Sequence, residues 1–78
     1  MMQPNEAVLK IEEEMGRTCG ALSSIIVGNV ATKLGLNKRE ISSREDYFKL
    51  INGLVEPANK FLGKTKAEES IKRWKTMV

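Results

Sequence analysis

Apolar residues recur along the chain at intervals of three and four, the spacing that places them on one side of an α-helix. Alternation of β-branched and polar residues, which would indicate strands, is absent. The pattern predicts an all-α fold: a small bundle of three to four helices forming a single helical domain over residues 1–78. A chain of 78 residues builds only a marginal core by itself, because small domains bury a smaller share of their surface than large ones.

The longest periodic stretch predicts a central N-terminal helix from about Asn5 to Leu34. Asn5 is placed to cap its start and Gly35 to end it. Gly16 and Gly20 are the two points where this helix could break. One seam along it follows the three–four rhythm of coiled coils, at Val8, Ile11, Met15, Thr18, Leu22, Ile25 and Asn29.

Two further helices are expected in the rest of the chain. Capping boxes of the Ser/Thr-x-x-Glu type, which mark helix starts, occur at Ser42–Glu45 and Thr65–Glu68. They predict helices from about Ser43 to Leu62 and from Thr65 to about Met77, separated by Gly63. The core is expected to contain Leu22, Ile25, Ile26, Phe48, Ile51, Val55 and Trp74.

Small residues lie four apart in the first predicted helix, within a stretch from Thr18 to Thr32 that carries no charge: Gly16, Gly20, Ser24, Gly28 and Thr32. On one helix they would form a ridge that another backbone can approach closely. Each helical glycine costs roughly 1 kcal/mol relative to alanine, so a compensating contact is expected.

This half of the helix is apolar or small nearly all round, and two other helices cover only part of it. We therefore predict a homo-oligomer, a dimer being favoured, whose contact face contains Gly20, Ser24, Val27, Gly28 and Ala31. The alternative is that the ridge packs against another helix of the same chain.

Residues that usually carry catalysis or bind metals are scarce. The chain has no histidine and one cysteine, Cys19, which excludes an intrachain disulfide, a usual zinc site and a histidine-activated thiol. Glu12, Glu13 and Glu14 are consecutive, so they point in different directions around a helix. Neither common glycine-rich phosphate-binding motif occurs. These observations predict a non-enzymatic protein without cofactor or metal, acting through self-association and protein–protein interaction.

The sequence also bears on location. The N-terminus lacks the basic segment of a signal peptide, and the uncharged stretch is shorter than the roughly 20 apolar residues that cross a bilayer. A lone cysteine fits a reducing compartment. We expect a cytoplasmic protein with no membrane partner.

Charge is unevenly distributed around a net value of +3. Residues 1–16 contain four glutamates and one lysine, whereas residues 60–78 are basic. The basic segment could contact nucleic acid through Lys72, Arg73 and Lys75, with Trp74 stacking on a base, or it could lie beside the acidic segment of its own chain. The helical spacing of Trp74 favours a core position.

A further alternative is a DNA-binding regulator that uses residues 30–46. Ala31, Gly35 and Ile41 have the spacing of the small residue, turn glycine and later apolar residue of a helix-turn-helix, which this segment resembles. The resemblance implies that Asn37 caps a recognition helix and that the groove is contacted by Lys38, Arg39 and Arg44.

Overall fold

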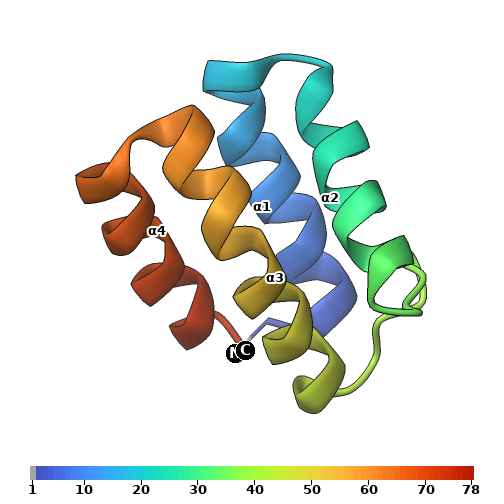
Figure 1. Ribbon diagram of the computed structural model, residues 1–78. Coiled ribbons are helices and arrows are strands. Elements are labelled where there is room, and N and C mark those ends of the chain that lie inside the picture. Colours follow the sequence, from blue (N-terminus) through green and yellow to red (C-terminus); the bar gives the residue numbers. More distant parts are fainter. Residues whose placement is uncertain (1) are drawn as a thin grey trace.

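The computed structural model describes residues 2–78, which form four α-helices and no strand. The helices are α1 (Pro4–Cys19), α2 (Leu22–Lys33), α3 (Arg44–Leu62) and α4 (Lys64–Thr76). They run alternately up and down, and α3 lies between α2 and α4 in the view of Figure 1. The two ends of the chain meet, where the Met2 amide donates to the Met77 carbonyl at 2.9 Å. The prediction of an all-α fold with three to four helices is confirmed.

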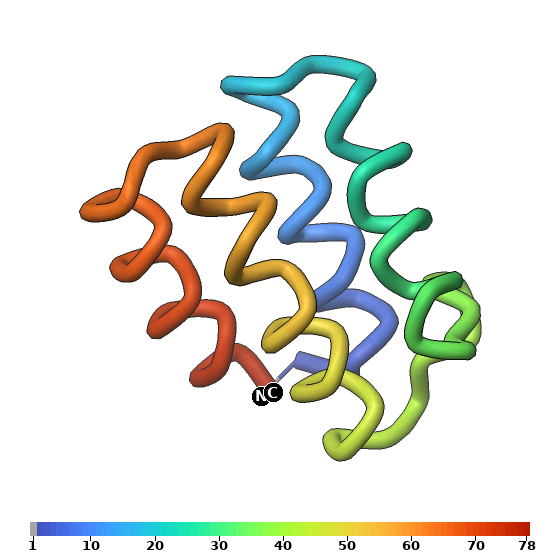
Figure 2. The backbone as a smooth tube through the Cα atoms, in the orientation of Figure 1, coloured from blue at the N-terminus to red at the C-terminus, as the bar shows by residue number. Residues whose placement is uncertain are grey.

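The expected long N-terminal helix is wrong, because the chain breaks after Cys19 and folds back (Figure 2). Gly20 adopts a positive φ of 61°, which glycine reaches without steric cost, and its carbonyl accepts from the Ser23 hydroxyl at 2.9 Å. A helix of about 30 residues would extend about 45 Å. The longest dimension of the molecule is 28 Å. The break therefore allows the uncharged half of the predicted helix to pack on the first half.

Two expected helix starts are also corrected. Pro4 is the first residue of α1, so Gln3 occupies the cap position and Asn5 lies inside the helix. Gly63, with φ of 84°, separates α3 from α4, and α4 begins at once with Lys64. Thr65 therefore lies within α4 and does not cap it.

The end of α2 agrees with the sequence prediction. Gly35 has a φ of 74°, its amide donates to the Thr32 carbonyl at 3.0 Å, and the Leu36 amide donates to the Ala31 carbonyl at 2.8 Å. These paired bonds are those of a Schellman motif, which satisfies carbonyls left free at a helix end.

Residues 36–43 connect α2 and α3 through turns and irregular backbone, so the recognition helix that the helix-turn-helix resemblance implies after Gly35 is not formed. Asn37 accepts from the Arg39 amide at 3.0 Å and caps a turn. The next helix begins at Arg44, where the Ser43 hydroxyl accepts from the Asp46 amide at 3.1 Å. The cap is thus one residue later than the predicted box.

The core draws on all four helices and on Ile41 from the connecting segment. Ile51 and Trp74 are fully buried as predicted, while Ile26 and Phe48 pack at its margin. Leu22, Ile25 and Val55 are exposed, so their assignment to the core is wrong.

The orientation of α2 accounts for the first two of these errors. Its buried side is formed by Ser23, Val27 and Ala31. A Cβ added at Gly16 would lie 3.5 Å from the Ser23 hydroxyl oxygen, so α1 and α2 approach closely through small residues. Larger side chains at this crossing would separate the helices. Part of the small-residue ridge therefore packs within the chain.

Candidate interaction surface

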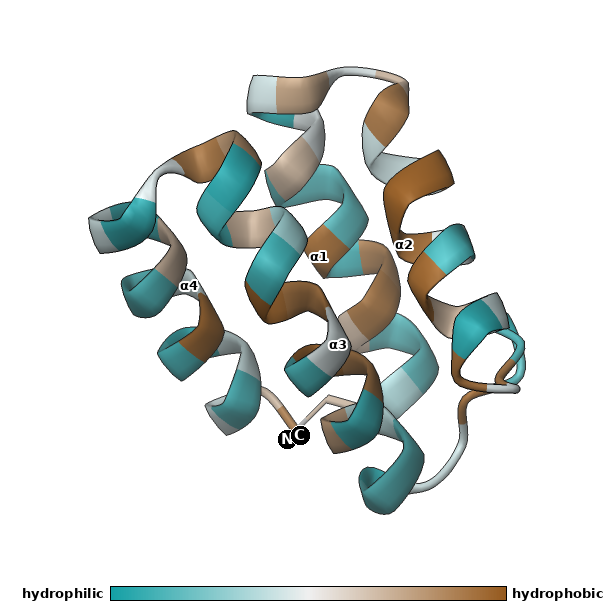
Figure 3. Ribbon diagram, viewed as in Figure 1, coloured by the Kyte–Doolittle hydropathy of each residue, from teal (hydrophilic) through white to brown (hydrophobic). Residues whose placement is uncertain are grey.

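Much of α2 is coloured as hydrophobic in Figure 3, and two of its large apolar residues are exposed, whereas surface helices usually present polar residues to solvent. Leu22 and Ile25 are 53% and 56% exposed, and Ile26 and Asn29 continue the same helical face at the next two positions. No charge occurs on α2 before Lys33, its last residue. The helix thus exposes two large aliphatic side chains, with the partly buried Ile26 next to them.

A groove of about 570 Å³ runs beside these residues, between α2 and α3. Its apolar lining includes Ile26 and Val30 from α2, Leu34 directly after the end of α2, and Pro57 and Phe61 from α3. Leu34 and Phe61 are both exposed. We call the surface formed by these residues together with Leu22 and Ile25 the α2–α3 face.

The two helices meet closely at Gly53. A Cβ built there would lie 2.7 Å from Val30 Cγ1 and 3.1 Å from Leu34 Cδ1. The absence of a side chain at this position allows α2 to approach α3, and it fixes which residues stand at the same level on the two helices.

Charges of both signs border the groove: Lys33, Glu56 and Lys60 line it, and all three are exposed. Across residues 2–78 the two ion pairs are Lys38–Glu12 and Arg73–Glu14, neither of which uses a groove charge. The charges of the groove are therefore available to a second molecule.

The residues predicted to form an oligomer contact are divided by the structure. Gly20 and Ser24 are exposed, but Val27 and Ala31 are buried in the core of the single chain. Lys38 lies over Gly28, with its Cε 3.7 Å from the position of an added Cβ. Val27 and Ala31 thus have no surface left for a second copy, which corrects that part of the predicted face.

Lys38 links the connecting segment to α1 and α2 through hydrogen bonds and an ion pair. Its Nζ donates to Glu12 Oε2 at 2.9 Å, to Ser24 Oγ at 2.6 Å and to the Ser24 carbonyl at 3.0 Å. The side chains of Lys38 and Glu12 are only 15% and 14% exposed. Gly28 and Ser24 leave the space that this lysine crosses, which gives the small residues a role inside the chain.

The residues predicted to contact nucleic acid belong to three parts of the chain: the segment between α2 and α3, the first residue of α3, and α4. Lys38 and Arg73 are held in ion pairs with Glu12 and Glu14. Arg44 begins α3 and lies 5.3 Å from the centroid of the Phe48 ring. Exposed positions free of these ion pairs are occupied by Arg39 on the connecting segment and by Lys72 and Lys75 on α4.

A buried network joins α1, α3 and α4 and contains the tryptophan considered for base stacking. Trp74 has no exposed surface, and its Nε1 donates to Glu14 Oε2 at 2.7 Å, while Arg73 also pairs with Glu14. The Tyr47 hydroxyl donates to the Trp74 carbonyl at 2.7 Å. Burial raises the pKa of Tyr47 to about 12, and the negative charge of Glu14 acts in the same direction. Trp74 is therefore a core residue, and the basic helix lies beside the acidic segment of its own chain.

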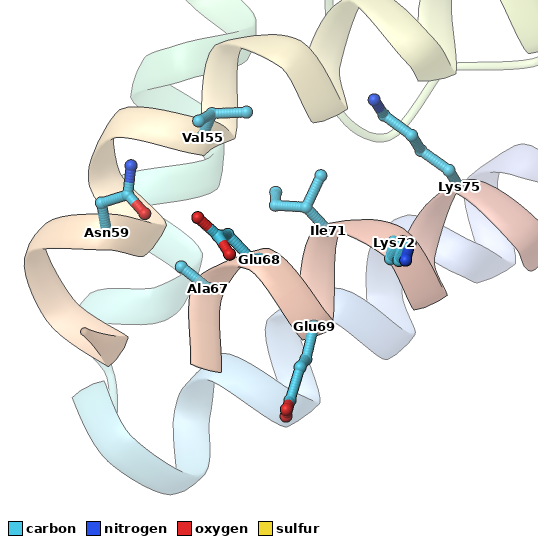
Figure 4. Close-up of a pocket in the computed structure, with 8 residues that line it drawn as sticks. All are labelled: Val55, Asn59, Ala67, Glu68, Glu69, Ile71, Lys72 and Lys75. Atoms are coloured by element: carbon cyan, nitrogen blue, oxygen red, sulfur yellow. The ribbon is translucent and has the colours of Figure 1, made fainter. Parts of the chain in front are cut away.

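A second groove, of about 440 Å³, lies between α3 and α4 (Figure 4). Val55 and Asn59 line it from α3, and Ile71 from α4, while Glu69 points away from them. Its border also includes Glu68 and the exposed Lys72 and Lys75. It is smaller than the α2–α3 groove and has fewer apolar residues.

The sequence reasoning missed the groove contributions of Leu34, Gly53 and Phe61 and the position of Lys38. The contacts of Lys38 lie 14 and 26 residues away in sequence, so no local spacing signals them. A signal for the orientation of α2 did exist, because Ser23, Val27 and Ala31 lie four residues apart.

No helix in the described range, residues 2–78, is long and apolar enough to cross a membrane. In comparisons with known proteins, the chain matches no family model, no curated protein and no solved structure. The surface itself therefore carries what can be inferred about function.

Proposed function

We propose that this protein is a non-enzymatic interaction protein that self-associates by covering the α2–α3 face with a second copy of the chain. The observation that carries the proposal is the pair of exposed large apolar residues on α2, Leu22 and Ile25, beside a groove with an apolar lining. Large apolar patches bordered by polar residues on soluble domains mark sites of interaction.

Burial of the exposed apolar side chains would favour association. Full burial of a leucine or isoleucine side chain contributes about 1.5–3 kcal/mol, so burying the exposed half of one yields about 1 kcal/mol. About half of the side-chain surface is still exposed in four residues of this face: Leu22, Ile25, Leu34 and Phe61. Covering these four side chains with a second copy therefore contributes favourably to association.

A standard interface buries about 800 Å² per partner, roughly a sixth of the 4967 Å² accessible to this chain. The mixed charges at the groove favour a second copy as the occupant, because Glu56 on one copy can meet a lysine on the other. A strongly acidic or basic partner would meet like charge somewhere along the same border.

Sedimentation of matched variants tests the proposal. Ile25→Asp should shift the protein to a monomer, because it places a carboxylate on the contact face. Leu9→Asp is the control: Leu9 is 58% exposed on α1, beside Arg39 and outside the α2–α3 groove. It should leave the mass unchanged. An equal effect of both substitutions, or a wild-type chain that stays monomeric at near-millimolar concentration, would contradict the proposal.

A further inference from the structure

We infer that the two copies pair about a two-fold axis along the groove, so that α2 of each lies against α3 of the other and Lys33 of each faces Glu56 of the other. This inference rests on the proposed self-association and adds its geometry and its selectivity. It follows from the position of each residue along the length of the groove, called its level below, and from the charges that border the groove.

The close contact at Gly53 defines these levels. Gly53 lies opposite Val30 and Leu34, and α2 and α3 run in opposite directions. Counting along the two helices from this point places Glu56 at the level of Asn29, one helical turn from Lys33. Lys33 and Glu56 therefore stand on opposite sides of the groove, close in level, without pairing in the chain.

A two-fold axis along the groove preserves these levels while exchanging the two sides. Lys33 of one copy then lies within a turn of Glu56 of the other, a gap that the long lysine side chain can bridge. The same operation brings Ile25 and Ile26 to Pro57 and Phe61 of the other copy. Because the interface is isologous, every contact occurs twice.

A different symmetry fits the surface less well. An axis across the groove at Asn29 would place α2 against α2, with Lys33 of one copy at the level of Ile25 of the other. The same axis would set Glu56 of one copy against Glu56 of the other, because Glu56 lies at the level of Asn29, so like charges would meet. Pairing of α2 with α3 instead brings Lys33 to Glu56 of the other copy; Lys60 then lies at the level of Ile25, where its long side chain can keep the charge in solvent.

Charge reversal tests the pairing. Lys33→Glu and Glu56→Lys each set like charges against each other at two symmetry-related sites, so each should raise the dimer dissociation constant about tenfold at low salt. The double variant restores opposite charges and should return the constant to near the wild-type value. Glu13→Lys, an exposed reversal of the same size on α1, is the control and should have little effect.

The outcomes separate the pairing from the proposed function. If the wild type self-associates but the double variant is no better than the single ones, this pairing is overturned while self-association stands. An equal effect of Glu13→Lys would also overturn it, because overall charge would then be responsible. If the wild type is monomeric throughout, the proposed function fails and the pairing with it. Circular dichroism of each variant confirms that the helices are retained.

Discussion

Substitution by alanine should change the free energy of unfolding in opposite directions at two helical glycines of similar exposure, Gly53 and Gly28. Gly53→Ala introduces a methyl group 2.7 Å from Val30 Cγ1, a distance that real Cβ contacts do not reach. Val30 is β-branched and stiff at χ1, so the clash is relieved mainly by moving α2 away from α3. Overpacking of this kind costs about 1–3 kcal/mol, against a gain of about 1 kcal/mol in helix propensity.

Gly28→Ala supplies the matched case. Its methyl group would meet the flexible Lys38 side chain at 3.7 Å, which is ordinary van der Waals contact. No steric cost then offsets the gain in helix propensity, which is about 0.5–1 kcal/mol. The free energy of unfolding should therefore rise for Gly28→Ala and fall by about 1 kcal/mol for Gly53→Ala.

Urea denaturation followed by the fluorescence of Trp74, the single tryptophan, measures both changes. Because association would add stability, the curves are recorded at low protein concentration. A Gly53→Ala variant at least as stable as the wild type would refute the close approach of α2 to α3. A loss of stability in Gly28→Ala would refute the placement of Lys38.

Three further predictions concern the contacts that hold the fold. Lys38→Met keeps the aliphatic chain but removes the charge, so we expect the free energy of unfolding to fall by about 1–2 kcal/mol; an unchanged denaturation midpoint would show that the lysine contributes nothing. Tyr47, the single tyrosine, should titrate by phenolate absorbance near pH 12 in the folded protein and near its usual pKa of 10.0 when unfolded. Because the fold favours the neutral phenol, this contribution to stability is complete below pH 10, falls as the pH rises towards 12 and disappears in Tyr47→Phe; a folded-state titration at pH 10 would contradict it. Ser43→Ala should cost about 1 kcal/mol because it removes the cap of α3, whereas Ser42→Ala should be nearly neutral; the reverse order would restore the cap to Ser42.

Local signals in the sequence predicted the helices well and their packing less well. Gly35 and Gly63 mark helix ends because positive φ favours glycine, and this requirement can be read from single positions. The break at Gly20 was among the expected points, but whether the helix ends there depends on the gain from packing α2 against α1. That gain depends on contacts between distant residues, which periodicity does not reveal.

For the same reason, the sequence predicted that the site exists on this segment but not which residues form it. An uncovered apolar face on the uncharged segment was expected, and α2 has one. The break at Gly20 resets the phase of the helix, so Val27 and Ala31 turn inward while Leu22 and Ile25, expected in the core, turn outward. Self-association therefore stays a prediction, now assigned to the opposite side of the same helix.

Amide spectra recorded by NMR during dilution test the central claim most directly, because they report both whether copies associate and where. The account predicts that signals from the outward side of α2 and from the second half of α3 shift with concentration, while those of α4 remain constant. Spectra that do not change with concentration, or changes confined to α4 and residues 36–43, would contradict it.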